Sequence, residues 1–150
     1  MPNYTITQIE DAIIDALKKS EMGSYCKKID SYQIEGKDLE DQIRIFAGRL
    51  PCALVVYSKG DYSHSPGRRQ DKEMTFQILV CSESLRSPNE PRRGETGTYK
   101  MLEDLRAALT GNNLGLDIIP LLPVSESAEA NVKGFSAYSM EFKTKITTTF

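Results

Sequence analysis

The fold is decided by two apolar stretches, Cys52-Ala53-Leu54-Val55-Val56-Tyr57 and Met74-Thr75-Phe76-Gln77-Ile78-Leu79-Val80-Cys81. Both are continuous and rich in β-branched and aromatic residues, which predicts two central strands buried on both faces. Between them lies a polar segment, Lys59 to Glu73, that contains Pro66 and Gly67. We therefore predict a long hairpin whose polar arm is a loop, and loops of this length are commonly functional.

Three segments have the spacing of amphipathic helices. The first begins with the capping-box form Thr5-Ile6-Thr7-Gln8 and has apolar residues at helical spacing up to Leu17, and Gly23 is its expected C-cap. The second, residues 39–50, places Leu and other apolar residues on one face and ends at a proline. The third runs from Thr98 to Gly111.

The other apolar patterns predict further strands. Residues 24–34 alternate weakly, and regular alternation marks Leu114–Leu122 and Phe135–Ile146. A second polar arm is expected at Glu83–Gly97, and a soft turn region at Val124–Lys133. Because successive strands without crossover helices favour antiparallel pairing, we predict an α+β fold with one mostly antiparallel sheet.

The sheet is expected to carry about three helices on one face, and a mixed sheet remains open as an alternative. Neither a repeat nor a linker composition interrupts the chain, so residues 1–150 are predicted to form a single domain.

Composition excludes several classes of function. The 19 lysines and arginines against 21 aspartates and glutamates give a net charge of −2, whereas a chain that coats DNA has a strong basic excess. Cys26, Cys52 and Cys81 lie far apart, which predicts reduced thiols rather than a disulfide framework. With neither a signal-peptide pattern nor a long apolar run, the sequence predicts no membrane association.

Residues that suggest chemistry lack the partners that the chemistry needs. His64 is the only histidine and has no ligand-spaced neighbours, so we assign it no role. Gly94 and Gly97 precede a helix as in phosphate-binding turns, but the complete nucleotide motifs are missing. Glu141 and Lys143, with an aspartate upstream at position 117, have the form of a metal-dependent nuclease site. Alternating charge on a half-exposed strand explains the last pattern better, so we predict no enzyme activity, no cofactor and no metal.

The first polar arm is the best candidate for a binding surface. It contains Arg68 and Arg69 together with Lys59 and Lys72, although nearby acidic residues nearly cancel their charge. Three interpretations stay open: a solvated loop, a polar contact surface for a protein partner, and, third, a nucleic-acid contact.

Several segments of the chain resemble, in order, a small protein family of Mu-like phages and prophages. They are Leu50-Pro51-Cys52-Ala53-Leu54-Val55-Val56-Tyr57, Thr75-Phe76-Gln77-Ile78-Leu79-Val80, Ser84-Leu85-Arg86-Ser87, Gly97-Thr98-Tyr99-Lys100-Met101-Leu102-Glu103-Asp104-Leu105-Arg106, Leu109-Thr110-Gly111, Leu116-Asp117-Ile118 and Phe135-Ser136-Ala137-Tyr138-Ser139-Met140-Glu141-Phe142. The resemblance runs from about Ile6 to Ile146, and its motifs are structural rather than catalytic.

That family is similar to tail-terminator proteins, which are encoded beside the sheath and tube genes of contractile tails. The resemblance implies a tail-terminator-like fold and a ring, generally of six copies, that caps the tail tube and sheath and offers a docking face to the neck. The expected partners are therefore the chain itself, the tube and sheath proteins and a neck or head-completion protein. The protein is expected in the virion tail, after synthesis in the host cytoplasm, with no membrane and no specific nucleic-acid partner.

Two rival functions remain open. The nearer one is a head-completion or neck adaptor, and the distant one is the metal-dependent nuclease suggested by Glu141 and Lys143. For the ring, the candidate subunit and partner contacts are basic side chains of the two arms and the last residue of the chain: Lys59, Arg68, Arg69, Lys72, Arg86, Arg92, Arg93 and Phe150.

Overall fold

The computed structural model describes residues 3–32, 49–84, 90–132 and 134–150. In chain order these residues form α1 (Ile6–Lys19), the 3-10 turn η1 (Glu21–Ser24), β1 (Lys28–Ser31), β2 (Cys52–Ser65), β3 (Arg69–Glu83), α3 (Glu90–Arg93), α4 (Thr98–Leu109), β4 (Leu122–Val132) and β5 (Phe135–Thr149). No helix formed by these residues is long and apolar enough to cross a membrane.

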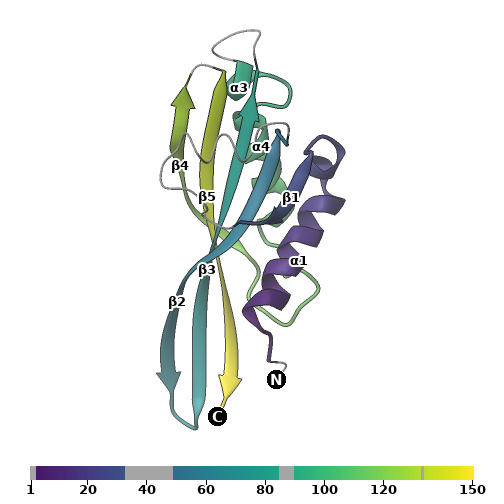
Figure 1. Ribbon diagram of the computed structural model, residues 1–150. Coiled ribbons are helices and arrows are strands. Elements are labelled where there is room, and N and C mark those ends of the chain that lie inside the picture. Colours follow the sequence, from purple (N-terminus) through teal and green to yellow (C-terminus); the bar gives the residue numbers. More distant parts are fainter. Residues whose placement is uncertain (1–2, 33–48, 85–89, 133) are drawn as a thin grey trace.

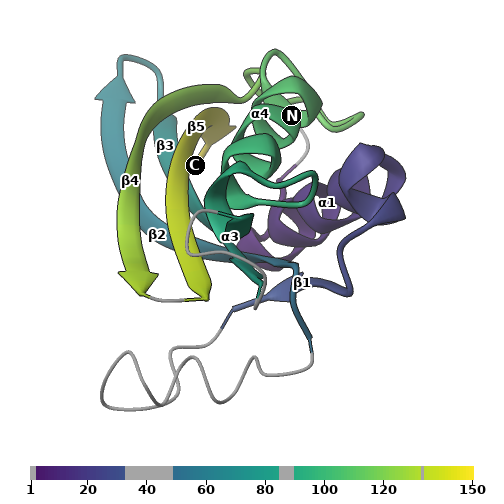
Figure 2. The same ribbon diagram turned by 90° about the horizontal axis from the view of Figure 1, so that it is seen from above.

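One five-stranded sheet, in the order β1-β2-β3-β5-β4, is the frame of the fold. β1 pairs with β2 in parallel, and the other neighbouring strands are antiparallel. α1 and α4 lie on the same face of this sheet (Figure 2). The predicted α+β fold with a mostly antiparallel, mixed sheet is therefore confirmed.

The main hydrophobic core lies between the two helices and the sheet. Its fully buried members include Ile9, Ile13 and Leu17 of α1, Met101, Leu105 and Leu109 of α4, and Phe76, Ile78 and Phe142 of the central strands. Burying one such side chain stabilises the folded state by roughly 1.5–3 kcal/mol. The opposite face of the sheet carries a smaller cluster that includes Cys52, Leu54, Cys81, Phe135 and Ala137. β2 and β3 are thus buried on both faces at these positions, as predicted.

α1 begins as the sequence predicts but ends earlier. The Thr5 hydroxyl accepts a hydrogen bond from the Gln8 amide at 3.1 Å, and the Gln8 side chain accepts one from the Thr5 amide at 2.8 Å, which completes the capping box. The C-cap is Ser20, not Gly23. The reason is that the Ser20 hydroxyl also caps η1, accepting from the Met22 amide at 3.2 Å, so a new turn starts there.

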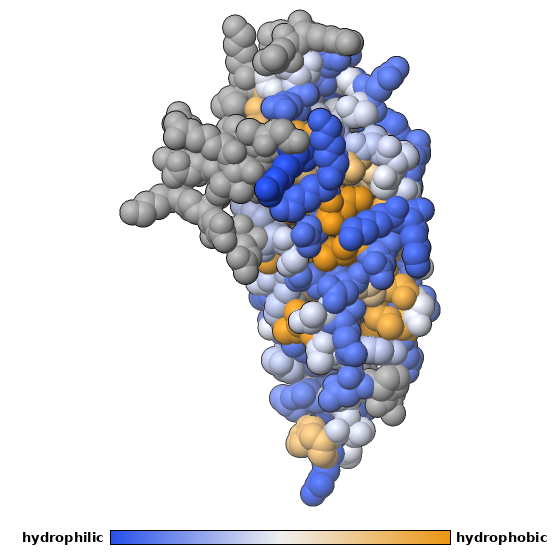
Figure 3. Space-filling model, turned by 45° about the vertical axis from the view of Figure 1, so that its right-hand side comes forward, coloured by the Kyte–Doolittle hydropathy of each residue, from blue (hydrophilic) through white to orange (hydrophobic). Residues whose placement is uncertain are grey.

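The predicted first polar arm is not a loop. β2 and β3 continue through it as a ladder that pairs Lys59 with Thr75 and Ser65 with Arg69, so only residues 66–68 form the turn. The end of β5 pairs with the same part of β3, up to Arg69 opposite Thr149. The three strands project beyond the helices and end near the C-terminus (Figure 1), and the molecule narrows toward this end in the space-filling view (Figure 3). We call residues 59–73 and 143–150 the extension.

The prediction of a strand at Leu114–Leu122 is wrong. The strand lies directly after this segment, as β4, Leu122–Val132. Residues 111–121 form turns, with a left-handed backbone at Gly111, Leu114 and Gly115 (φ 74°, 60° and 72°). β4 instead occupies the region expected to be a soft turn, because pairing with β5 supplies its backbone partners. Its exposed edge position explains why its sequence lacks an apolar pattern.

The described residues do not confirm the expected number of about three helices. The described residues contain two long helices, α1 and α4, and the four-residue α3. Most of the helix expected over 39–50 lies outside the described residues. α3 falls within the second predicted polar arm, of which residues 85–89 also lie outside the described part. β1 confirms the weak strand expected within residues 24–34.

Candidate partner-binding surface

The extension brings together most of the predicted contact residues. Lys59, Arg68, Arg69, Lys72 and Phe150 all lie on it, on three segments that are distant in the sequence. Arg92 and Arg93 lie on α3, at the other end of the molecule (Figure 1). Arg86 lies outside the described residues.

A tight turn forms the tip of the extension. Gly67 and Arg68 both have a left-handed backbone, with φ of 85° and 62°. The carbonyl oxygen of Arg68 accepts a hydrogen bond from the amide of Phe150 at 2.9 Å. This hydrogen bond continues the β3–β5 pairing past Thr149, the last residue of β5. It therefore holds Phe150 against the turn of the β2–β3 hairpin.

The face of the extension that continues the main core carries aromatic side chains. The cross-strand register places Tyr62, Lys72 and Ile146 in one row. Ile146 belongs to the main core, so this row lies on the face that continues the core. The Lys72 ammonium lies 5.3 Å from the ring centroid of Tyr62. Nearer the tip, the ring of His64 meets that of Phe150 edge to face, with centroids 6.2 Å apart. Tyr62 is 58% exposed and Phe150 is 68% exposed.

The opposite face of the extension is a ladder of ion pairs. Lys143 pairs with Glu73 at 3.0 Å and Lys145 with Asp71 at 3.8 Å, while Lys59 pairs with Asp61 of its own strand at 3.4 Å. The Thr147 hydroxyl donates to Asp71 at 2.6 Å. This hydrogen bond, and then the charges of Lys145 and Arg69, lower the pKa of Asp71.

The tip itself keeps uncompensated positive charge. Arg68 and Arg69 are exposed, and neither forms an ion pair with another residue in the described ranges. Aromatic and arginine side chains are enriched at protein interfaces. Here the rings lie on one face of the extension, and Arg69 alternates to the face of Asp71. We call Tyr62, Arg68, Arg69 and Phe150 the tip surface.

Sequence reasoning missed the aromatic part of the tip surface. Tyr62 and His64 occupy alternate positions of β2, so both side chains lie on the same face, opposite Lys72 and Gln70 of β3. The side-chain amide nitrogen of Gln70 lies 3.0 Å from His64 Nε2. The signal was this alternation, which a loop assignment hides. His64, to which we assigned no role, packs against Phe150.

Comparison with known protein families identifies the chain's relatives. Residues 5–147 match the family model described as Bacteriophage Mu, Gp37. The chain belongs to this family. It is therefore a tail-related structural protein of Mu-like phages, as the resemblance predicted. A search of curated proteins gave no significant match.

The Gp37-family match covers nearly all of the extension. It includes Arg68, Arg69 and the ion-pair ladder, and it ends at Thr147, before Phe150. The basic hairpin therefore lies within the part of the chain that the family model describes.

The residues with a nuclease-like pattern do not converge in this Gp37-family chain. Lys143 contacts Glu73, and the Glu141 carboxylate accepts from the Ser125 hydroxyl at 3.4 Å. Asp117 was expected on a strand but lies among the turns before β4, where its backbone amide donates to the Tyr4 hydroxyl. Among the described residues, no group of three or more His, Cys, Asp and Glu side chains is placed to hold a metal ion.

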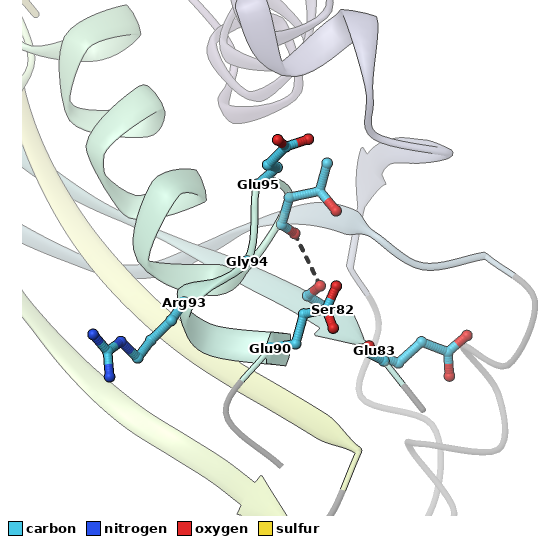
Figure 4. Close-up of a pocket in the computed structure, with 8 residues that line it drawn as sticks. Ser82, Glu83, Glu90, Arg93, Gly94 and Glu95 are labelled. Carbon is cyan, nitrogen blue, oxygen red and sulfur yellow. Dashed lines mark hydrogen bonds between the residues drawn. The ribbon is translucent and has the colours of Figure 1, made fainter. Parts of the chain in front are cut away.

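A pocket of about 600 Å³ lies where the sequence suggested a phosphate-binding turn (Figure 4). Its lining includes three carboxylates, those of Glu83, Glu90 and Glu95, and one arginine, Arg93, which points away from the other labelled side chains. Excess negative charge disfavours a phosphate ligand. Gly97 has a packing role, because a Cβ there would lie 2.4 Å from a carbonyl oxygen of α3.

Proposed function

We propose that this protein is the tail terminator of a contractile, Mu-like phage tail. Copies of the chain form a ring, with six subunits as the expected number, on the last ring of the tail tube and the end of the sheath. The ring covers the edges that otherwise recruit further tail subunits and offers the neck or head-completion protein its docking face. The role is structural, needs no cofactor, and places the protein in the virion tail after synthesis in the host cytoplasm.

The observation that carries this proposal is the extension with its tip surface. A three-stranded arm that reaches beyond the body gives one subunit the means to contact another protein outside its own core. Heterologous contacts of this kind close into rings when the rotation between subunits closes. Membership of a tail-related phage family supports the same role.

The test is the length of tails assembled without this protein. Tails from a phage lacking the gene should be overlong or headless in electron micrographs, because nothing stops polymerisation or receives the head. Wild-type protein supplied in trans should restore normal length and infectivity, whereas the Arg68→Glu/Arg69→Glu variant should not. Tails of normal length in the deletion strain would contradict the terminator role and favour a neck adaptor.

A further inference from the structure

The extension and the rest of the chain carry opposite net charges. Residues 59–73 and 143–150 contain six lysines or arginines and three aspartates or glutamates, which gives +3. Since the whole chain carries −2, the remainder carries −5. Separated charges of this kind favour head-to-tail association of identical copies, because the basic end of one attracts the acidic body of the next.

A second apolar surface, distinct from the tip surface, lies beside β5. Residues 119–124, Ile-Pro-Leu-Leu-Pro-Val, contain no charge. Ile119, Leu122 and Val124 are 54%, 55% and 48% exposed, and both prolines are exposed as well. We call these residues the apolar strip. Contiguous exposed apolar side chains in a soluble protein typically mark an interaction site.

Backbone hydrogen bonds hold the strip in place. Ile119 donates to the carbonyl of Lys145 at 3.0 Å and accepts from the Thr144 hydroxyl at 2.5 Å. Leu121 accepts from Gly111 at 2.8 Å and donates to Asn112 at 3.0 Å. A surface that is already ordered loses little conformational entropy when a partner binds.

Acidic residues flank the strip. Asp117 precedes Ile119 and Glu126 follows Val124, each by two positions; both are exposed, and neither forms an ion pair within the described ranges. The nearby lysines, Lys143 and Lys145, are already paired with carboxylates of β3. The free charge beside the strip is therefore negative, opposite to the free charge of Arg68 and Arg69.

Arg68 and Phe150 are too far from the strip to cover it within one chain, and Tyr62, in the row of Ile146, is separated from it by β3 and β5. The strip contacts β5 at Lys145 and Lys143, whereas Phe150 lies at the end of the same strand. Five to seven residues of extended chain separate them, or roughly 16–24 Å at about 3.3 Å per residue. A second copy of the chain can bring its own tip to the strip.

Addition of another strand to the open edge of β4 explains such a contact less well. β4 has register shifts at Pro123/Ser125 and Ala128/Ala130. Bulges of this kind at sheet edges hinder the addition of another strand. Contact through side chains at the tip avoids this obstacle.

We propose that the tip surface of one copy packs on the apolar strip of the next copy in the ring. Tyr62 and Phe150 cover the apolar strip, and Arg68 and Arg69 meet Asp117 and Glu126. This contact rests on the proposed ring and assigns its two surfaces. Because the surfaces differ, the contact is heterologous and repeats around a closed ring.

Charge exchange tests the contact directly. The variants Arg68→Glu/Arg69→Glu and Asp117→Arg/Glu126→Arg should each remain monomers in size-exclusion chromatography with light scattering, where wild-type protein forms a ring. An equimolar mixture of the two should recover the wild-type mass, because each acidic tip then meets a basic strip in an alternating ring. The matched control is Lys18→Glu/Lys19→Glu, the same charge change on two exposed residues of α1, which should assemble normally.

Several results would overturn the contact: a monomeric wild type, wild-type assembly by either variant alone, or a mixture that stays disassembled although both variants fold by circular dichroism. The tail-length assay reads out the function separately. Overlong tails in the deletion strain with an unsuccessful charge exchange would leave the terminator role standing without this contact. A successful charge exchange together with tails of normal length in the deletion strain would support the contact and contradict the terminator role.

Discussion

At the level of single residues, the turn at the tip depends on one glycine. Gly67 has φ of 85°, and a Cβ placed there would meet no heavy atom within 4 Å. Gly67→Ala therefore adds no clash, only the cost of a left-handed backbone, and should lower the free energy of unfolding by about 1 kcal/mol. Urea unfolding measures this change. Ser63→Ala on the adjacent strand is the control and should change stability by less than about 0.5 kcal/mol. Equal losses in both variants would contradict the explanation.

Asp71 makes the ion-pair ladder sensitive to acid. Its pKa is lowered by the Thr147 hydrogen bond first, and then by Lys145 and Arg69. A lowered pKa in the folded state adds stability above the unfolded pKa, and this contribution is lost as pH falls through the folded pKa. Thr147→Val should raise the pKa of Asp71 toward its ordinary value in a carboxyl NMR titration. The same substitution at Thr149, which is exposed, should leave that titration unchanged.

The positions of several candidate contact residues could be predicted from the sequence, because the two central strands were predicted correctly. Once Cys52–Tyr57 and Met74–Cys81 are paired as a hairpin, Arg68 and Arg69 must lie near its turn. Phe150 was named as a candidate contact for a different reason, since it ends a Thr-rich, uncharged segment, and the structure places it next to Arg68. The aromatic face was not predicted, because side-chain alternation has meaning only once the polar arm is known to be strand.

At the level of elements, side-chain contacts tie η1 to α4, among them an ion pair of 3.4 Å between Glu21 and Lys100. The Tyr25 hydroxyl donates to Asp104 at 2.6 Å, and Lys100 lies 3.0 Å from the same carboxylate. Burial, and then Asp104, raise the pKa of Tyr25 well above its usual value. Tyr25→Phe should cost about 1–2 kcal/mol of stability in urea unfolding, because hydrogen bonds to charged groups are the stronger ones. Tyr99→Phe is the control: the Tyr99 ring packs on Tyr138, and its substitution should be nearly neutral. A neutral Tyr25→Phe would contradict this assignment.

Elements with a local signal were predicted well, and elements that depend on distant partners were not. α1 and α4 have both an apolar stripe and a capping or terminal signal in their own residues. β4 has neither, because it is an edge strand whose only regular partner is β5. The outer halves of β2 and β3 contain few apolar residues, and their strand structure comes from cross-strand pairing and ion pairs. A local pattern therefore predicts the body of this fold better than its extension.

At the level of the whole molecule, the outer part of the extension, residues 61–73 and 147–150, is separable from the core. None of the buried core residues lies within 61–73 or 147–150. Joining Gly60 to Met74 through an Asn-Gly turn and ending the chain at Ile146 would remove the tip surface and keep every core side chain. Two-residue turns of this sequence suit an antiparallel hairpin. Each cross-strand ion pair that is lost has a lysine partner more than 40% exposed and contributes no more than about 1 kcal/mol.

The shortened chain should therefore unfold in a single cooperative transition with a circular dichroism spectrum that retains helix and sheet. It should also be monomeric in light scattering and unable to restore tail length in the deletion strain, because the body keeps the apolar strip but offers no tip to it. When mixed with full-length protein it should occupy the end of an open chain of subunits and prevent ring closure. An unfolded product would show that the extension is part of the folding unit, and a shortened chain that still forms rings would place the subunit contact on the body alone.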